Sequence, residues 1–138
     1  MKKLSLLAGA ALVALTMLPL APAHADELVG YSNGSVDLLA GPDGSFPVVA
    51  HVEPNAGLKI IGCQQGFTWC DVSMNGQRGW INGHFLDNVY NDKHVNVVEF
   101  GPQQNVPTVV FQQRTYWDTY YHDRPFYTEH RYWTLSPP

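Results

Sequence analysis

A tight turn at Asn75-Gly76 is the feature that most constrains the fold of this chain. Residues 67–74 before the turn follow a period of two, and residues 78–81 after it form a short return segment. Asn-Gly favours the type I′ turn of a two-residue hairpin, because both central residues of that turn need positive φ. A period of two is typical of a strand with one buried face. The sequence therefore predicts an antiparallel β-hairpin at this position.

The rest of residues 31–86 alternates between short apolar segments and turn signals. The apolar segments are residues 36–38, 46–52 and 58–61, and the turns are residues 41–44, 54–57 and 64–66. Several short strands between turns rich in Gly, Pro and Asn are typical of antiparallel all-β domains. We therefore predict the all-β fold class and a small barrel.

The N-terminal residues have the layout of a secretory signal peptide. Lys2 and Lys3 are followed by the apolar run Leu4–Leu18 and by the small-residue pattern Ala23-His24-Ala25. The alternative is a membrane anchor, but the apolar run is shorter than the ~20 residues that a spanning helix needs. We predict a signal peptide over residues 1–25, no membrane span after its removal, and a periplasmic or secreted bacterial protein.

The two cysteines, Cys63 and Cys70, both follow the predicted signal peptide. An even number of cysteines in an exported chain favours a disulfide, and these two fall on opposite arms of one predicted hairpin. A shared metal ion is the alternative, but the spacing fits known zinc patterns poorly. We predict a Cys63–Cys70 disulfide, no metal and no cofactor.

Four segments in order resemble the bacterial SH3-like (SH3b) domain. They are Val36–Val49, Gly66–Val72, Asn75–Ile81 and Gly83–Leu86. The resemblance covers about residues 28 to 87, and it departs from the family pattern at two positions, where Asp37 and Leu39 replace the usual Asn and Arg. It implies an SH3-like barrel over residues 26–90 that acts as a non-enzymatic binding module. Such modules often target the cell wall and are usually attached to a hydrolase, which is not recognised in this sequence.

Residues 91–138 are expected to form a polar linker and an aromatic-rich C-terminal extension. The linker holds one predicted strand over residues 95–100. The aromatic residues of the extension are Tyr116, Trp117, Tyr120, Tyr121, Phe126, Tyr127, Tyr132 and Trp133. Their spacing from residue 116 to 121 gathers side chains on one side of a short helix, which Pro125 would end. A similar extension occurs in some secreted proteobacterial SH3b proteins, which this one resembles.

This extension has two interpretations. It folds back over one face of the barrel, or it forms an exposed binding strip. Eight large aromatic side chains in water would favour aggregation, so folding back is preferred. A packed extension can still present polar groups at its rim.

Aromatic side chains are also the candidate binding residues. Trp69 and Trp80 lie on facing arms of the predicted hairpin, where flat rings can dock a peptide or a glycan. The alternative is that these rings pack in the core or at its rim. The predicted binding residues are Tyr31, Phe67, Trp69, Trp80, Trp117 and Tyr120. The partner expected is a cell-wall peptide, a glycan or an envelope protein, and the oligomeric state is left open.

Other functions are less compatible with the sequence. Charged residues make up only 14 % of the chain, and a nucleic-acid binder needs clustered Lys and Arg, so no nucleic-acid partner is expected. The serines stand in no known nucleophile motif. A metal or acid–base site is suggested by the residue types of His122, Asp123 and His130, but their spacing fits no metal-ligand motif. No partner is evident in the sequence for His51, His84 and His94. We therefore predict a non-catalytic protein.

Overall fold

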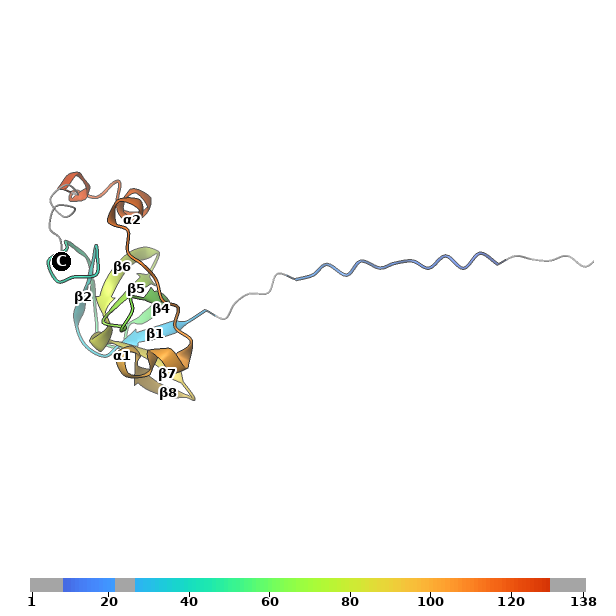
Figure 1. Ribbon diagram of the computed structural model, residues 1–138, viewed down its shortest axis with the longest axis horizontal. Coiled ribbons are helices and arrows are strands. Elements are labelled where there is room, and N and C mark those ends of the chain that lie inside the picture. Colours follow the sequence, from blue (N-terminus) through green and yellow to red (C-terminus); the bar gives the residue numbers. More distant parts are fainter. Residues whose placement is uncertain (1–8, 22–26, 130–138) are drawn as a thin grey trace, which may run out of the picture.

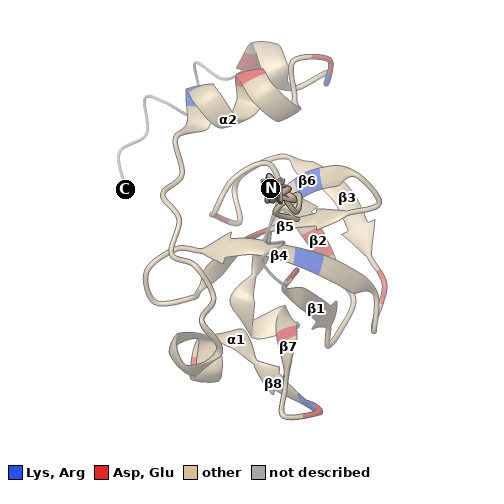
Figure 2. Cartoon of the chain, turned by 90° about the vertical axis from the view of Figure 1, so that its right-hand side faces the viewer, with Lys and Arg blue, Asp and Glu red and all other residues tan. Residues whose placement is uncertain are grey.

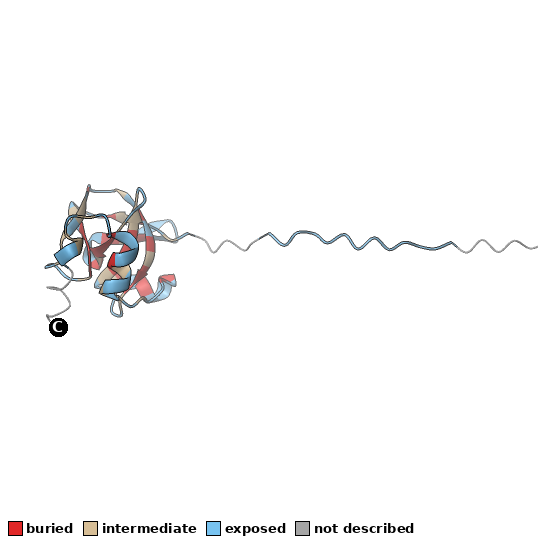
Figure 3. Cartoon of the chain, turned by 90° about the horizontal axis from the view of Figure 1, so that it is seen from above, coloured by how far each residue is buried: buried red, intermediate tan, exposed pale blue. Residues whose placement is uncertain are grey.

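The computed structural model describes residues 9–21 and 27–129 (Figure 1). Residues 9–21 are an exposed stretch without regular structure that leads away from the folded domain (Figure 3). Lys2, Lys3 and Ala23–Ala25, on which the signal-peptide prediction depends, lie outside the described residues. Within the described ranges, no helix has the length and apolarity to cross a membrane.

The domain is one eight-stranded sheet that curls into a half-barrel, followed by two short helices. The strands are β1 (Val29–Ser32), β2 (Val36–Leu39), β3 (Val48–Val52), β4 (Gly57–Cys63), β5 (Trp69–Met74), β6 (Gln77–Asn82), β7 (Leu86–Tyr90) and β8 (Lys93–Asn96). The α-helices are α1 (Val97–Phe100) and α2 (Gln113–Tyr120), and single 3-10 turns lie at Gly83–Phe85, Gly101–Gln104 and Tyr127–Glu129. These eight strands pair antiparallel throughout, and the strand order is β3-β2-β6-β5-β4-β1-β7-β8. The predicted fold class is confirmed.

The hairpin predicted at Asn75-Gly76 joins β5 to β6. Asn75 has φ 49° and Gly76 has φ 79°, the positive values that a type I′ turn requires. Asp71 of β5 lies opposite Trp80 of β6 in the register of this hairpin. The hairpin therefore carries two faces, one turned toward the barrel core and one turned outward.

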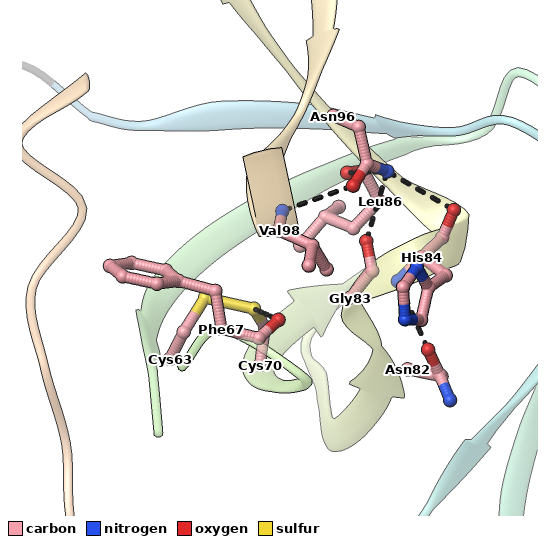
Figure 4. The surroundings of a disulfide bond; sticks show 9 residues. All are labelled: Cys63, Phe67, Cys70, Asn82, Gly83, His84, Leu86, Asn96 and Val98. Carbon is pink, nitrogen blue, oxygen red and sulfur yellow. Dashed lines mark hydrogen bonds between the residues drawn. A yellow bond between two sulfur atoms is a disulfide. The ribbon is translucent and has the colours of Figure 1, made fainter. Parts of the chain in front are cut away.

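The inner face closes on an apolar core that contains the disulfide. Cys63 of β4 lies directly opposite Cys70 of β5, and the two are bonded and fully buried. Figure 4 shows the ring of Phe67 beside this bond. The predicted disulfide is confirmed. The other fully packed side chains of this core include Leu38, Val52, Leu58, Ile60, Val72, Ile81 and Leu86.

The sheet continues beyond the expected end of the barrel at residue 90. Asn91 and Asp92 both have positive φ and form the turn to β8, so the expected linker begins as a hairpin. The strand predicted over residues 95–100 is wrong from Val97 onward, because the Asn96 side chain caps α1 by accepting from Val98 N at 3.0 Å. Asn96 also donates to three main-chain oxygens near β7, two of them drawn in Figure 4.

The chain then crosses the edge of β4 on its way to α2 (Figure 2). Cys63 N donates to Pro107 O and Val109 N donates to Cys63 O, both at 2.8 Å. Gly62 lies under this crossing, where a Cβ atom would be 2.5 Å from Val109 Cγ1 and 2.8 Å from Pro107 O. Only glycine allows so close an approach, and the crossing directs the following residues onto the outer face of the β5–β6 hairpin.

Candidate binding site

The outer face of the β5–β6 hairpin is covered by the C-terminal extension. The Trp80 side chain is only 1 % exposed, with its ring centroid 5.4 Å from Phe111 and 5.9 Å from Tyr116. The edge-on and tilted ring contacts are favourable arrangements for aromatic pairs. The surface on which a Trp69–Trp80 groove was predicted is therefore filled by the chain itself.

Helix α2 anchors this cover through Trp117. The Trp117 side chain is fully buried, and its indole Nε1 donates to Ala40 O at 2.8 Å. Phe46 and Phe126 pack against its ring edge-on, at centroid distances of 6.3 and 5.2 Å. With Tyr121, which is 2 % exposed, these residues form a second apolar cluster outside the barrel. In the part of the extension that the structure describes, folding back is confirmed, while Tyr132, Trp133 and His130 lie outside it.

A polar network joins the barrel to the extension beside these rings. Asp71 is 4 % exposed and accepts from Arg78 Nε and Nη2, both at 2.7 Å, in a two-pronged ion pair. The Tyr116 hydroxyl donates to the same carboxylate at 2.7 Å. Arg78 Nη1 donates to the Tyr120 hydroxyl, and the Tyr121 hydroxyl donates to Arg78 O, each at 2.8 Å. Two tyrosines of the extension thus bond the charged groups of one ion pair of the hairpin, and a third bonds the main chain of Arg78.

Burial sets the protonation states of this network. Burial, with the charge of Asp71 among the further causes, raises the pKa of Tyr116 far above its ordinary value, so the hydroxyl keeps its proton. Burial likewise raises the pKa of Tyr121. Burial alone would lower the pKa of Arg78, but the hydrogen bonds and charge of Asp71 outweigh it, and the pKa is raised. Tyr116 and Tyr121 therefore stay neutral and Arg78 stays charged across physiological pH.

The six predicted binding residues do not share one open surface. Trp80 and Trp117 are both buried, because the extension covers the outer face of the β5–β6 hairpin. For Trp80 this agrees with the alternative that its ring packs in the core or at its rim. Phe67 and Trp69 are half-buried, and Tyr120 is 39 % exposed at the rim of the extension. Tyr31 is half-buried on another part of the sheet, where it stacks on His94 at 4.8 Å. A binding role for these side chains stays a prediction.

Two open depressions lie where the extension meets the hairpins of the barrel. One is a cleft of about 210 Å³ whose lining includes Val49, Gln77, Arg78, Tyr120, Asp123 and Arg124. The other, of about 490 Å³, is lined by Val48, Arg124, Pro125, Phe126 and Glu129. Arg124 borders both, so the loop after α2 and the barrel together shape these openings. We call the first of them the junction cleft.

A hydrogen-bonded chain on the β2–β3 hairpin was missed by sequence reasoning. His51 lies opposite Asp37, with His51 Nδ1 2.8 Å from Asp37 Oδ1 and His51 Nε2 2.9 Å from Ser35 Oγ. The hydrogen bond to Asp37 raises the pKa of His51. The order of groups matches that of a hydrolytic triad, but the side chains of His51 and Asp37 are 52 % and 48 % exposed. Glu53 also approaches His51 Nε2, at 3.6 Å.

This chain of hydrogen bonds links the two strands of the β2–β3 hairpin. Water screens half-exposed charges, so the imidazole gains little of the activation that a buried triad provides. No sequence motif predicts that His51 contacts Asp37, because this contact depends on the register of β2 and β3. Its only signal is the spacing of Ser35 and Asp37 on one face of a strand, with His51 on the next.

The described residues hold no group of three His, Cys, Asp or Glu side chains that could bind a metal ion. Asp118, near the His122 and Asp123 pair considered above, instead accepts a hydrogen bond from the Tyr127 hydroxyl at 2.5 Å.

Comparison with protein families matches residues 34–87 to the bacterial SH3 domain. This range runs from just before β2 to the start of β7, so it contains both hairpins that border the junction cleft and excludes the extension. Neither the curated proteins nor the solved structures gave a match.

Proposed function

We propose that this chain, whose residues 34–87 match the bacterial SH3 domain, is an exported, non-catalytic binding module of the cell envelope. The family match is the observation that carries this proposal, because domains of this family are binding modules and are commonly related to the cell wall. The buried disulfide between Cys63 and Cys70 supports a location outside the reducing cytoplasm. The predicted signal peptide at residues 1–25 agrees with that location.

A cell-wall peptide is the ligand we favour. The aromatic face of the β5–β6 hairpin is occupied, so it cannot dock a glycan without moving the extension. The junction cleft remains open and offers a cation at Arg124, polar groups and the apolar side chain of Val49. A short peptide with a charged end fits this mixture better than a neutral sugar chain does.

A second candidate function rests on the extension itself. Its fully buried Trp117 and the covered Trp80 show that the extension occupies the face where an aromatic groove was predicted. We propose as the alternative that the extension controls access to this face, or presents its own outer surface to an envelope protein. Tyr120, which is 39 % exposed beside the ion pair of Arg78, would then lie at the contact.

Retention on purified cell-wall sacculi separates these candidates. Sacculi from a Gram-negative bacterium are compared with the same material after an amidase has removed the stem peptides. Retention that requires the stem peptides supports the peptide ligand, whereas equal retention on both materials supports a glycan. The absence of retention on either material contradicts the cell-wall function and leaves the envelope-protein alternative. Trp69→Ala tests the half-buried aromatic candidate, with Phe85→Ala, a change at a 39 % exposed ring, as the matched control.

A further inference from the structure

Arg124 is a half-buried cation without an anionic partner among the described residues. Its Nη2 donates to Val49 O at 2.7 Å, and its guanidinium lies 5.8 Å from the centroid of the Phe126 ring. Its Nε is buried and has no hydrogen-bond partner. No ion pair joins Arg124 to a carboxylate in residues 9–21 or 27–129.

Arg78, the other arginine that lines the junction cleft, has a counter-ion within the chain. Arg78 is held by both oxygens of Asp71 and by the Tyr120 hydroxyl, so its charge is balanced within the chain. Removing a guanidinium from water without a counter-ion is costly, and buried charges are therefore normally paired. Arg124 is half-buried like Arg78 but has no carboxylate partner among the described residues, which points to an anion supplied from outside them.

We propose that Arg124 binds the terminal carboxylate of a short peptide in the junction cleft. The planar guanidinium can hold a carboxylate by two parallel hydrogen bonds, and Arg124 lines the cleft where the carboxylate would lie. The cleft, at about 210 Å³, is smaller than the ~300–1,000 Å³ of a typical small-molecule pocket. That size admits the end of a peptide with small side chains. This inference rests on the proposed function and names the part of the ligand that is recognised.

The surrounding charges favour a carboxylate over a phosphate. Asp123 lines the junction cleft and Glu129 lines the neighbouring depression, and both border the space around Arg124. Two carboxylates close to the binding group oppose a dianion more strongly than a single negative charge. Val49 and Phe126 add apolar surface beside the guanidinium, which suits the methyl groups of small amino acids.

The test is an NMR titration of the folded protein with N-acetyl-alanyl-alanine. The free acid is expected to shift the Arg124 Nε–H resonance and to bind at least tenfold more tightly than its C-terminal amide. This comparison uses the unmodified chain, so it does not depend on whether a variant folds. Equal binding of acid and amide, no binding of either, or inorganic phosphate binding as tightly as the free acid would overturn the proposal.

Variants then locate the site. Arg124→Gln should lose at least tenfold in affinity for the free acid, and Arg124→Lys should recover part of it. Arg114→Gln makes the same change of charge at an exposed position of α2 and should bind as the wild type does. Near-ultraviolet circular dichroism checks that the Arg124 variants keep the packed extension. Unchanged affinity in folded Arg124→Gln contradicts the proposal.

The outcome on sacculi separates this inference from the proposed function. If the free acid binds through Arg124 but sacculi retain no protein, the cell-wall function fails and the carboxylate site stands. If sacculi retain wild-type protein and Arg124→Gln equally, the function stands and the carboxylate site is wrong.

Discussion

The Asp71 carboxylate in the barrel accepts a hydrogen bond of 2.7 Å from the hydroxyl of Tyr116 in the extension, 45 residues further along the chain. Asp71 is already paired with Arg78, so the extension completes an ion pair that the barrel alone would leave only partly satisfied. Since an incompletely bonded buried charge is costly, the barrel and the extension should be one cooperative folding unit.

Removing the Tyr116 hydroxyl should weaken this unit measurably. Tyr116→Phe deletes one hydrogen bond to a buried carboxylate, and we expect the free energy of unfolding to fall by about 1.5–3 kcal/mol. Urea denaturation followed by circular dichroism measures the change. Tyr120→Phe is the control, because that hydroxyl is exposed and its loss should cost less than ~1 kcal/mol. Equal losses in the two variants would show that Asp71 does not depend on Tyr116.

Truncation of Trp117 should have the largest effect of any change in the extension. Trp117→Ala leaves a void between α2 and the barrel and frees Ala40 O, so we expect a loss of about 3–5 kcal/mol. Val110→Ala, a change at a side chain that is 84 % exposed, should cost very little. Thermal unfolding of both variants checks this difference, and an unchanged melting temperature in Trp117→Ala would mean that α2 does not pack as described.

The disulfide should contribute to stability through the unfolded state. Closing the short loop from Cys63 to Cys70 removes about 2–3 kcal/mol of chain entropy from that state. The double variant Cys63→Ala/Cys70→Ala should therefore unfold at a lower urea concentration than the oxidised wild type. Two reactive thiols per chain in unreduced protein isolated from the envelope would contradict the pairing.

The link between His51 and Asp37 should make the β2–β3 hairpin more stable in mild acid. The pKa of His51 is raised above its usual 6.5 by the hydrogen bond to Asp37, so the folded chain holds the proton more tightly than the unfolded chain does. The resulting stabilisation is complete below pH 6.5 and is lost as the pH rises through the raised pKa. An NMR titration of the His51 ring should give a lower pKa in Asp37→Asn than in the wild type. The same pKa in both proteins would rule out the link.

The β5–β6 hairpin and the disulfide could be predicted because their determinants are local. Asn75-Gly76 dictates the β5–β6 turn, and the two cysteines lie opposite each other at the ends of the neighbouring β4–β5 hairpin. The same kind of signal was present at Asn91 and Asp92, where positive φ produces the turn to β8. It was missed because the polar composition after Leu86 was interpreted as a linker.

The site could be predicted only in part, because its geometry depends on contacts between distant segments. The aromatic pattern from Tyr116 to Tyr121 correctly predicted a short helix, and the hazard of exposed rings correctly favoured packing. The sequence does not reveal that Phe111 and Tyr116 cover Trp80, since that follows from the crossing of β4 at Gly62. For the same reason, the sequence does not reveal that Arg124 lacks a carboxylate partner among the described residues.

The extension covers Trp80 on the aromatic face of the barrel, and for this reason we propose that ligands meet the junction cleft instead. Nuclear Overhauser effects from the Trp80 indole in the full-length folded protein test this directly. The structure predicts strong effects to the rings of Phe111 and Tyr116, whose centroids lie 5.4 and 5.9 Å from that of Trp80. The absence of both effects, together with rapid exchange of the Trp80 indole N–H with solvent, would contradict the claim.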